Sequence, residues 1–515
     1  MFAAEAHVRL MDVLDSLDPI VGELGNRFDQ AGFELALVGG SVRDALLGRE
    51  IPDLDFTTDA RPDDIEKIIA PWADTYWDIG RKFGTIGMMK RGYQVEITTY
   101  RADSYDPQSR KPTVAFGDNL DDDLVRRDFT IGAMAVRLPS RTFVDPYNGL
   151  GALEKRIIIT PGSATTSFTD DPLRMMRAAR FVSQLGFSLA PEVRAAMSDM
   201  ADRISIVSAE RVRDELTKLI VGAQPWAGID ALVNTGLADQ ILPEVSGLRL
   251  ERDEHHRHKD VYQHSLTVLR QAVELEGEYA KRALLNAEGE AGDSVAEQAQ
   301  DTAKKVTVDP GFTAPDFIVR FAALMHDVGK PATRRFAPGG AVTFYHHDVV
   351  GAKLTRSRMK ALNFDKETIS KVARLVELHL RFYGYGDAGW TDSAVRRYVT
   401  DAGDLLTRLH ILTRSDVTTR NRRKAERLAF AYDDLEQRIE ALAKKEAISA
   451  IRPDLNGQQI MEILHINPGP VVGRAYKHML EIRMEHGPLS YDEARLQLLK
   501  WWETAESGLH TEQNP

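Results

Sequence analysis

The sequence predicts an α+β protein in which a mixed β-sheet domain is followed by largely helical domains. From residue 33 to about residue 144, short apolar strands alternate with amphipathic helices, which is the pattern of a mixed α/β domain. After Pro161 the strand signals almost vanish, and apolar residues recur at helical spacing to about residue 505. A chain of 515 residues also has the length of three or four domains of about 150 residues each.

The composition is that of a globular protein that does not span a membrane. Hydrophobic residues make up 43% and charged residues 28% of the chain, which is ordinary for soluble proteins. No apolar run approaches the roughly 20 residues that a bilayer requires, and the N-terminus lacks a signal sequence. We therefore expect the protein to remain in the cytoplasm.

Charge and cysteine content restrict the chemistry further. The chain has no cysteine, which excludes disulfides and thiolate metal sites and leaves His, Asp and Glu as metal ligands. A formal net charge of −11 argues against a protein that binds polyanions through its average charge. Local arginine-rich patches still permit RNA binding.

The expected elements follow from the apolar pattern. Residues 5–30 show helical spacing and predict two leading helices. Residues 286–312 are small and polar, so we expect a disordered insertion there. A hairpin or loop is expected at residues 338–345, and the polar loop from 101 to 124 is long enough to act as a lid. The expected strands and helices of the mixed domain are at 36–38, 54–57, 63–70, 85–89, 94–99 and 130–136.

Two aspartates, Asp53 and Asp55, stand two positions apart in one expected strand. Side chains alternate between the faces of a strand, so both carboxylates point to the same side. Hard oxygen ligands at this spacing suit Mg²⁺, which shares its other coordination sites with water and phosphate oxygens. Two such ions about 4 Å apart can activate a hydroxyl and stabilise a departing pyrophosphate. Taken alone, however, such acidic pairs are also common on solvated turns.

A glycine turn precedes the aspartates. Residues 35–38 are apolar and β-prone, Gly39 and Gly40 interrupt them, and residues 41–47 are predicted to form a helix. A backbone without side chains can approach a triphosphate closely, and the helix N-terminus adds partial positive charge. The order of strand, turn, helix and carboxylate pair therefore indicates nucleotide transfer. Neither a P-loop nor a dinucleotide-binding fingerprint is present here.

Further motifs follow in order along the chain: Arg126-Arg127-Asp128 with residues 129–135, residues 144–150, and Asp170-Asp171-Pro172-Leu173-Arg174 with residues 175–181. With these motifs the chain resembles the class II CCA-adding tRNA nucleotidyltransferases and the related bacterial poly(A) polymerases. The resemblance covers most of residues 35–245. It implies a nucleotidyltransferase-type mixed-sheet head followed by a helical neck.

The resemblance also implies a role for each matching residue. Asp53 and Asp55 would be catalytic and would hold Mg²⁺. The other matching residues would bind the nucleotide: Gly39, Gly40 and Arg43 its phosphates, Arg126, Arg127 and Asp128 its triphosphate and ribose, Asp171 and Arg174 its base, and Arg177 and Arg180 as a basic wall.

Base reading by Asp171 and Arg174 is chemically plausible. Three residues apart in a helix, they would lie on neighbouring surface and present an acceptor beside donors. Cytosine and adenine each display an amino donor beside a ring-nitrogen acceptor, whereas uracil and guanine display a carbonyl beside an N–H. One pair can therefore accept C and A, and unpaired polar groups would penalise U and G. The alternative is an ordinary surface ion pair. Arg180 would lie nearly opposite Asp171 in a regular helix.

The chain departs from the family pattern at two positions. Gly132 stands where the family usually has Asn, which removes an amide near the ribose and any hydrogen bond that it makes. Asp170 replaces the usual Glu, a conservative change that keeps the neighbouring Asp171 carboxylate.

One further strand residue leaves two interpretations open, and one further helical motif is expected to be structural. Glu96 lies on an expected strand and is either a third metal carboxylate or a solvent-facing residue. Glu210, Arg211 and Glu215 match another helical motif of the family, for which we expect a structural role.

A second set of histidines and aspartates begins after about residue 250, with members His264, His326, Asp327, His347, His379 and Asp416. In this order the set resembles the HD phosphohydrolase superfamily. Imidazole and carboxylate ligands suit Mg, Mn, Fe, Ni or Co. The resemblance implies phosphomonoesterase or cyclic phosphodiesterase chemistry by metal-activated water, although such a domain can also persist as a scaffold. The implied ligands are His264, His326, Asp327 and Asp416 for one ion, and His347 and His379 for a second.

The resemblance divides the chain into five parts: leading helices at 1–30, the head at 31–160, a neck with the base-reading motif at 161–248, an HD-type domain at 249–430 and a helical RNA-binding tail at 431–515. We predict a template-independent enzyme that adds CMP, CMP and AMP from CTP and ATP to the 3′ end of tRNA, with neither DNA nor a membrane as partner. Poly(A) polymerase and partial CC or A addition are alternatives of the same fold. An alternative of another class is an HD hydrolase with a nucleotide-binding front half. The oligomeric state does not follow from the sequence.

Overall fold

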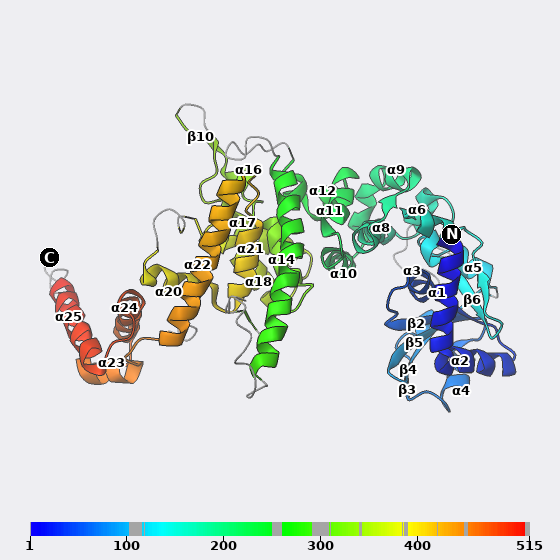
Figure 1. Ribbon diagram of the computed structural model, residues 1–515, viewed down its shortest axis with the longest axis horizontal. Helices are drawn as coiled ribbons and strands as arrows, with labels where there is room; N and C mark the ends of the chain where they lie inside the picture. Colours follow the sequence, from blue (N-terminus) through cyan, green and yellow to red (C-terminus); the bar gives the residue numbers. More distant parts are fainter. Residues whose placement is uncertain are drawn as a thin grey trace. The chain divides into compact units, whose positions relative to one another are not determined.

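The chain forms two compact units, Met1–Ser246 and Gly247–Pro515 (Figure 1). The first unit contains a β-sheet with helices, and the described residues of the second unit form helices and one small hairpin. The predicted α+β fold class is thereby confirmed. The computed structural model describes residues 2–101, 116–117, 119–249, 260–290, 308–309, 311–338, 342–383, 385, 390–419, 421–446 and 452–509.

A seven-stranded mixed sheet forms the centre of the head, with strand order β3-β4-β5-β2-β1-β6-β7. Strands β2 and β5 pair in parallel, whereas the other neighbouring strands pair antiparallel. All four residues of β1 are buried, as expected for a central strand with both faces covered. The strands are β1 (Leu35–Val38), β2 (Asp53–Thr58), β3 (Thr75–Trp77), β4 (Thr85–Lys90), β5 (Tyr93–Thr99), β6 (Ala135–Leu138) and β7 (Thr142–Val144).

Helices of the first unit begin with the two predicted leading helices, α1 (Phe2–Ser16) and α2 (Asp18–Gln30). The predicted helix after the glycine turn is also present, as α3 (Gly40–Leu47). The other helical elements of the head are α4 (Pro62–Ile69), η1 (Arg81–Phe83), α5 (Leu120–Val125), η2 (Thr130–Gly132) and α6 (Gly149–Lys155). After the head follow α7 (Ala164–Asp170), α8 (Leu173–Leu185), α9 (Pro191–Asp199), η3 (Ala201–Ile206), α10 (Ala209–Ile220), α11 (Pro225–Asn234), α12 (Leu237–Ile241) and α13 (Pro243–Ser246), with a small parallel pair β8 (Ile157–Ile158) and β9 (Ser188–Leu189).

The strand predicted at 130–136 is wrong in its first half. Residues Thr130–Gly132 form the 3₁₀ turn η2, and strand β6 begins only at Ala135. The apolar run continues through both elements, because the residues of the turn are as buried as those of the strand. Burial alone therefore could not separate a buried turn from a buried strand.

The second unit is built mainly from long helices, of which α14 is the longest (Figure 1). The hairpin expected at 338–345 is present, as β10 (Arg335–Phe336) and β11 (Val342–Thr343), although residues 339–341 lie outside the described part. The helical elements of the second unit are α14 (Val261–Glu290), α15 (Phe317–Met325), α16 (Lys330–Thr333), α17 (His347–Ala361), α18 (Lys366–Leu378), α20 (Asp392–Ala402), η5 (Gly403–Leu405), α21 (Leu406–Ser415), α22 (Arg422–Glu446), α23 (Gly457–Leu464), α24 (Pro470–His486) and α25 (Tyr491–Leu509).

The insertion predicted to be disordered at 286–312 is too long at both ends. Residues 286–290 continue α14, and Val308 and Phe312 are buried. Phe312 also lies 5.5 Å beneath the Arg408 guanidinium. A polar average over the stretch conceals these two apolar anchors, which are enough to order its end. Residues 291–307 and 310 lie outside the described part, as do residues 102–115 and 118 of the expected lid.

Buried ionic groups join the long helices of the second unit. Glu276 of α14 accepts hydrogen bonds from the Arg320 guanidinium of α15. Arg414 of α21 donates to Glu436 of α22, and the Tyr279 hydroxyl of α14 donates to the same carboxylate. These contacts hold α14, α15, α21 and α22 in one packed group. No helix in the described part of the chain has the length and apolar character to cross a membrane.

Candidate functional site

The glycine turn and the aspartate pair are held together by one serine. Ser41, in the first turn of α3, donates its hydroxyl to the backbone oxygen of Asp53 and accepts from the backbone N–H of Asp55, at 3.0 and 3.1 Å. Gly39 makes this approach possible with a φ of +67°, a conformation that favours glycine. The turn therefore lies directly beside strand β2.

Glu96 faces the same cavity as Asp55. The two residues are paired in the parallel register of β2 and β5, and both line a cavity of about 350 Å³. Burial, and then the Glu96 carboxylate, raise the pKa of Asp55 to about 6. A bound cation would relieve this repulsion, so the carboxylate set fits a divalent metal. Of the two readings of Glu96, the structure supports the one in which its side chain faces the site.

Asp53 occupies a different position from Asp55. Its side chain is exposed, and it does not belong to the lining of the cavity. In the described part of the chain, some groups of three ligand atoms lie within 4.8 Å of one another. The carboxylates of Asp53, Asp55 and Glu96 do not form such a group. The head thus presents an open acidic edge rather than a closed metal cage.

Arg126 and Arg127 form one wall of the cavity, and a buried aspartate positions both. Asp123 of α5 accepts from Arg126 at 2.6 Å and from Arg127 at 3.0 Å through its two carboxylate oxygens. Burial alone would raise the pKa of Asp123, but the two guanidinium groups hold it below its usual value. Asp123 was not among the site residues predicted from the sequence. Its signal was an aspartate three and four positions ahead of two arginines in a helix.

Asp128, Arg174 and Arg177 continue this wall. Arg177 donates to the Asp128 carboxylate at 2.6 Å. Arg174 donates to the Ser167 hydroxyl at 2.8 Å and to the backbone oxygen of Arg126 at 2.6 Å. Against the effect of burial, Arg177 lowers the pKa of Asp128. Each guanidinium is therefore fixed before any ligand arrives.

Asp171 does not share a helix with Arg174, contrary to the helical interpretation. It precedes α8 with an extended backbone, φ −142° and ψ 101°. Proline disfavours the helical conformation in the residue before it, and Pro172 follows Asp171. The carboxylate accepts from the backbone N–H of Leu173 at 3.1 Å and from Arg211 at 2.9 Å. Asp171 and Arg174 nevertheless line the same cavity.

Arg211 of α10 is a cavity residue as well, although the sequence analysis expected only a structural role. Its neighbour Glu215 is buried and lies 2.9 Å from the Arg180 guanidinium. Arg180 also lies over the Phe181 ring. Arg180 does not belong to the cavity lining, so its place in the basic wall stays a prediction.

The remaining predicted nucleotide residues lie beside the cavity, outside its lining. Arg43 is bound to the neighbouring Asp44 carboxylate. A Cβ added to Gly39 would lie 3.0 Å from Arg127, and one added to Gly40 would lie 3.6 Å from Arg43. At Gly132, an added Cβ would meet only the Asp128 carboxylate, at 3.6 Å. The position thus has room for a larger side chain.

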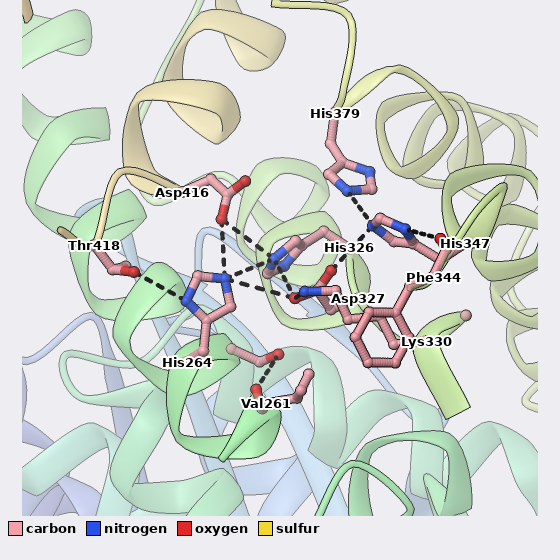
Figure 2. Close-up of polar contacts among 12 residues, drawn as sticks. Val261, His264, His326, Asp327, Lys330, Phe344, His347, His379, Asp416 and Thr418 are labelled. Atoms are coloured by element: carbon pink, nitrogen blue, oxygen red, sulfur yellow. Dashed lines mark hydrogen bonds and ion pairs between the residues drawn. The ribbon is translucent and has the colours of Figure 1, made fainter. Parts of the chain in front are cut away.

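The second constellation gathers six side chains at one point of the second unit (Figure 2). Each lies at or next to a helix end: His264 in α14, His326 and Asp327 after α15, His347 at the start of α17, His379 after α18 and Asp416 after α21. All except Asp416 are almost completely buried. Helix packing therefore brings together residues that are up to 152 positions apart in the chain, from His264 to Asp416.

These side chains form two groups, each with three ligand atoms within 4.8 Å of one another: His264, His326 and Asp416, and Asp327, His347 and His379. The implied ligand set places Asp327 with the first ion, in a His-Asp pair that can bridge two ions. One of its carboxylate oxygens lies 3.2 Å from His326, and the other lies 3.4 Å from His347. Asp327 therefore lies between the groups, where one carboxylate can bridge two ions.

Backbone oxygens orient three of the imidazoles. His326, His347 and His379 each place Nδ1 at 2.7–2.8 Å from the carbonyl oxygen three residues earlier. His264 differs from these three, because its Nδ1 contacts a side chain, the Thr418 hydroxyl, at 3.1 Å (Figure 2). An Nδ1–H that donates outward leaves the Nε2 lone pair free to point inward. This donor set fits divalent metal ions.

The charges of the group are strongly coupled. Burial alone would lower the pKa of His326, but Asp327 and Asp416 raise it to about 10. Burial and the neighbouring His326 lower the pKa of His379 to about 4. Lys330, missed by the sequence analysis, lies 2.9 Å from Asp327 and is buried. Positive charge thus compensates the buried aspartate.

Family models match three parts of the chain. Residues 35–159 match the poly A polymerase head domain, residues 186–248 a probable RNA- and SrmB-binding site of polymerase A, and residues 261–421 the HD domain. Domains of the head and HD types generally use divalent metals. The chain therefore contains one part similar to poly A polymerase head domains and another similar to HD domains.

The named relatives are CCA-adding enzymes. The chain is 41% identical over 233 residues to the CCA-adding enzyme of Lactobacillus johnsonii, which is 45% of this chain and 56% of the relative. It is 42% identical over 213 residues to that of Geobacillus thermodenitrificans, which is 41% of this chain and 52% of the relative. The chain therefore spans about half the length of the curated relatives that it matches.

Solved structures resemble the chain over almost its full length. One is the Bacillus stearothermophilus CCA-adding enzyme in complex with CTP, with a TM-score of 0.61, 22% identity and coverage of 95% of this chain and 99% of that one. Another is the Thermotoga maritima CCA-adding enzyme complexed with tRNA, with a TM-score of 0.56, 17% identity and coverage of 97% and 98%. At these identities the likeness shows the fold.

The buried Asp123 yields a stability prediction. Asp123→Asn leaves two guanidinium groups without their carboxylate and should lower the free energy of unfolding by roughly 2–3 kcal/mol. The loss is not larger because both guanidinium groups still reach solvent. The folded-state pKa of Asp123 is depressed, so its contribution is present above the unfolded value of about 3.9 and is lost as pH falls. Urea unfolding at pH 7 measures the loss. The exposed neighbour Asp121→Asn is the control, and equal losses in both variants would contradict the assignment.

The second constellation yields a metal-binding prediction. His326→Ala should remove bound divalent metal from the second unit. One ion would lose a direct ligand, and the other would lose the neighbouring site with which it shares Asp327. Metal content after dialysis, measured by plasma mass spectrometry, checks this. His346→Asn is the matched control, because His346 is next to His347 but belongs to neither group. Unchanged metal content in His326→Ala would rule out a metal centre here.

Proposed function

We propose that the protein is a CCA-adding tRNA nucleotidyltransferase, which adds CMP, CMP and AMP from CTP and ATP to the tRNA 3′ end. The observation that supports the proposal is one shared cavity, whose lining includes Asp55, Glu96, Asp171 and Arg174. One nucleotide can contact acidic and base-reading groups at once in such a space. The similarity to CCA-adding enzymes supports the same reaction.

In the proposed reaction, the terminal 3′-hydroxyl of tRNA attacks the α-phosphorus. The new P–O bond forms as the bond to pyrophosphate breaks, and the hydroxyl proton leaves to solvent. Asp53, Asp55 and Glu96 would hold Mg²⁺, which supplies charge stabilisation and activation of the hydroxyl. Arg126 and Arg127, fixed by Asp123, would orient the triphosphate. Catalysis would rest mainly on positioning and charge.

Base selection is proposed to reside in Asp171 and Arg174. Arg211 and the Leu173 N–H hold the Asp171 carboxylate, and Ser167 and a backbone oxygen hold Arg174. A fixed acceptor beside fixed donors matches C and A, and leaves polar groups unpaired against U and G. Selection by these residues does not require a shared helix.

The proposed partners are tRNA, CTP and ATP, and the proposed location is the cytoplasm. The RNA would be held along its backbone, as suits the wide minor groove of an A-form acceptor stem. The head is proposed to end near residue 160, the neck near 248, and the HD-type domain near 430. Poly(A) polymerase and partial CC or A addition use the same cavity chemistry, so the length and order of the added nucleotides decide among them.

A nucleotide-addition assay tests the proposed function. A tRNA that ends before CCA is incubated with each NTP singly and with CTP and ATP together. Growth by C, C and A followed by arrest is expected, whereas an unbounded A ladder would indicate a poly(A) polymerase. The double variant Asp53→Ala/Asp55→Ala should abolish incorporation, and absence of incorporation by the unaltered protein would refute the proposal.

Arg211→Ala tests the base-reading arrangement. The Asp171 carboxylate would lose one of its two anchors, so incorporation of UMP or GMP relative to CMP should rise about tenfold. Primer extension with single NTPs measures the ratio of kcat/KM values. Lys218→Ala, an exposed cation at the end of the same helix α10, is the matched control. An unchanged ratio in Arg211→Ala would show that Asp171 is held without it.

A second activity is proposed for the HD constellation, namely metal-dependent hydrolysis of a phosphoester. The bridging position of Asp327 and an adjoining cavity of about 540 Å³ favour it. The metal would be Mg²⁺, Mn²⁺, Ni²⁺ or Co²⁺, and would supply an activated water. His326→Ala/Asp327→Ala should leave nucleotide addition intact while abolishing hydrolysis.

A further inference from the structure

A second, smaller cavity adjoins the HD constellation and has no role in the arrangement described so far. Its volume is about 200 Å³, and it lies between the residues after α18, the end of α21 and the beginning of α22. Sites for drug-sized ligands have about 300–1,000 Å³. The cavity is therefore large enough for part of a ligand, and the 540 Å³ cavity on the other side of the constellation is large enough for the rest.

The two cavities meet at the candidate metal ligands. Four residues line both of them: His379, Tyr383, Asp416 and Lys424. Two of these, His379 and Asp416, belong to different ligand groups. A molecule that spans the junction would therefore place its middle against the metal positions and one end in the smaller cavity.

The smaller cavity has a rigid apolar floor. The rings of Phe382 and Tyr432 stack with centroids 3.6 Å apart and planes 14° from parallel. The Tyr432 hydroxyl donates to the backbone oxygen of Thr413 at 2.8 Å, which anchors α22 to α21. Leu428 and Ala431 complete this floor from the next turns of α22. Such a surface favours an apolar or flat ring group over a strongly hydrated one.

Two cations lie at the rim of the apolar floor. Lys424 and Arg427 are exposed residues of α22 that line the cavity. The helix is fixed at this point, because the Asn421 side chain accepts from the backbone N–H of Lys424 at 3.2 Å. Lys424 lines both cavities and thus lies at their junction. A cation there suits a phosphate group beside the metal ligands.

We propose that the smaller cavity is a subsite for the ester group of a phosphoester, with the phosphate at the junction beside Lys424. The preferred substrate then carries a compact ring on the ester oxygen, and Lys424 is a phosphate-binding residue. The proposal rests on the proposed hydrolase activity of the HD constellation. It goes further by assigning the chemical class of the ester group.

Binding of stable phosphonates to the full-length protein tests the subsite. Phosphonates have a P–C bond that hydrolysis does not cleave, so affinity is measured without turnover. Isothermal titration calorimetry in excess Mn²⁺ compares phenylphosphonate with methylphosphonate. The unaltered protein should bind the phenyl compound about tenfold more tightly, because the ring leaves water for the apolar floor.

Variants separate the ring contact from the phosphate contact. Leu428→Trp fills the cavity and should abolish the preference for the phenyl compound while leaving the methylphosphonate Kd unchanged. Ala431→Leu is a second filling variant with the same expected result, and unchanged nucleotide addition shows that each variant is folded. Lys424→Ala should weaken both compounds about tenfold. Arg423→Ala, on the same helix but outside the lining, should change neither.

Three results would overturn the subsite: equal affinities for the two phosphonates, a preference that survives both filling variants, or equal effects of Arg423→Ala and Lys424→Ala. Turnover of phenyl phosphate in Mn²⁺ distinguishes this proposal from the underlying hydrolase. If the binding pattern holds but phenyl phosphate is not hydrolysed, the subsite stands and the hydrolase activity fails. If phenyl phosphate is hydrolysed but the two phosphonates bind with equal affinity, the hydrolase activity stands and the subsite fails.

Discussion

The parallel pairing of β2 with β5 is the contact on which the cavity of the head depends. It sets Asp55 beside Glu96 in the register of the two strands. The pairing also carries an electrostatic cost, since burial and, after it, the Glu96 carboxylate raise the pKa of Asp55 to about 6. The two hydrogen bonds of the Ser41 hydroxyl keep strand β2 against the glycine turn. The acidic edge and the glycine turn are thus joined directly by hydrogen bonds.

Around that edge, the cavity is built from arginines that are already paired. Asp123 fixes Arg126 and Arg127, and Asp128 fixes Arg177. A guanidinium that is held in place loses little rotamer freedom when a triphosphate binds, so more of the interaction energy remains for affinity. Each buried acid also needs its arginines, because its own burial is unfavourable without them.

Part of this site could be predicted from the sequence, and the features that could not be predicted depend on more than local pattern. The glycine turn, helix α3 and the Asp53–Asp55 strand follow from local rules, because backbone freedom and strand alternation act over a few residues. The orientation of Glu96 depends on strand register, which local pattern does not specify. Asp171 was misassigned to a helix because Pro172 overrides periodicity.

The two candidate metal sites differ in how far the protein completes them alone. In the HD constellation, backbone carbonyls orient three imidazoles and Asp327 lies between two complete groups of three ligand atoms. In the head, Asp53 is exposed and the carboxylates form no such group within the described residues. A hydrolase needs its metals before the substrate arrives, so that a water can be activated. A transferase whose substrate brings three phosphates can leave its Mg²⁺ site incomplete, because those phosphates supply the missing oxygen ligands. The difference in preorganisation therefore agrees with a different reaction at each site.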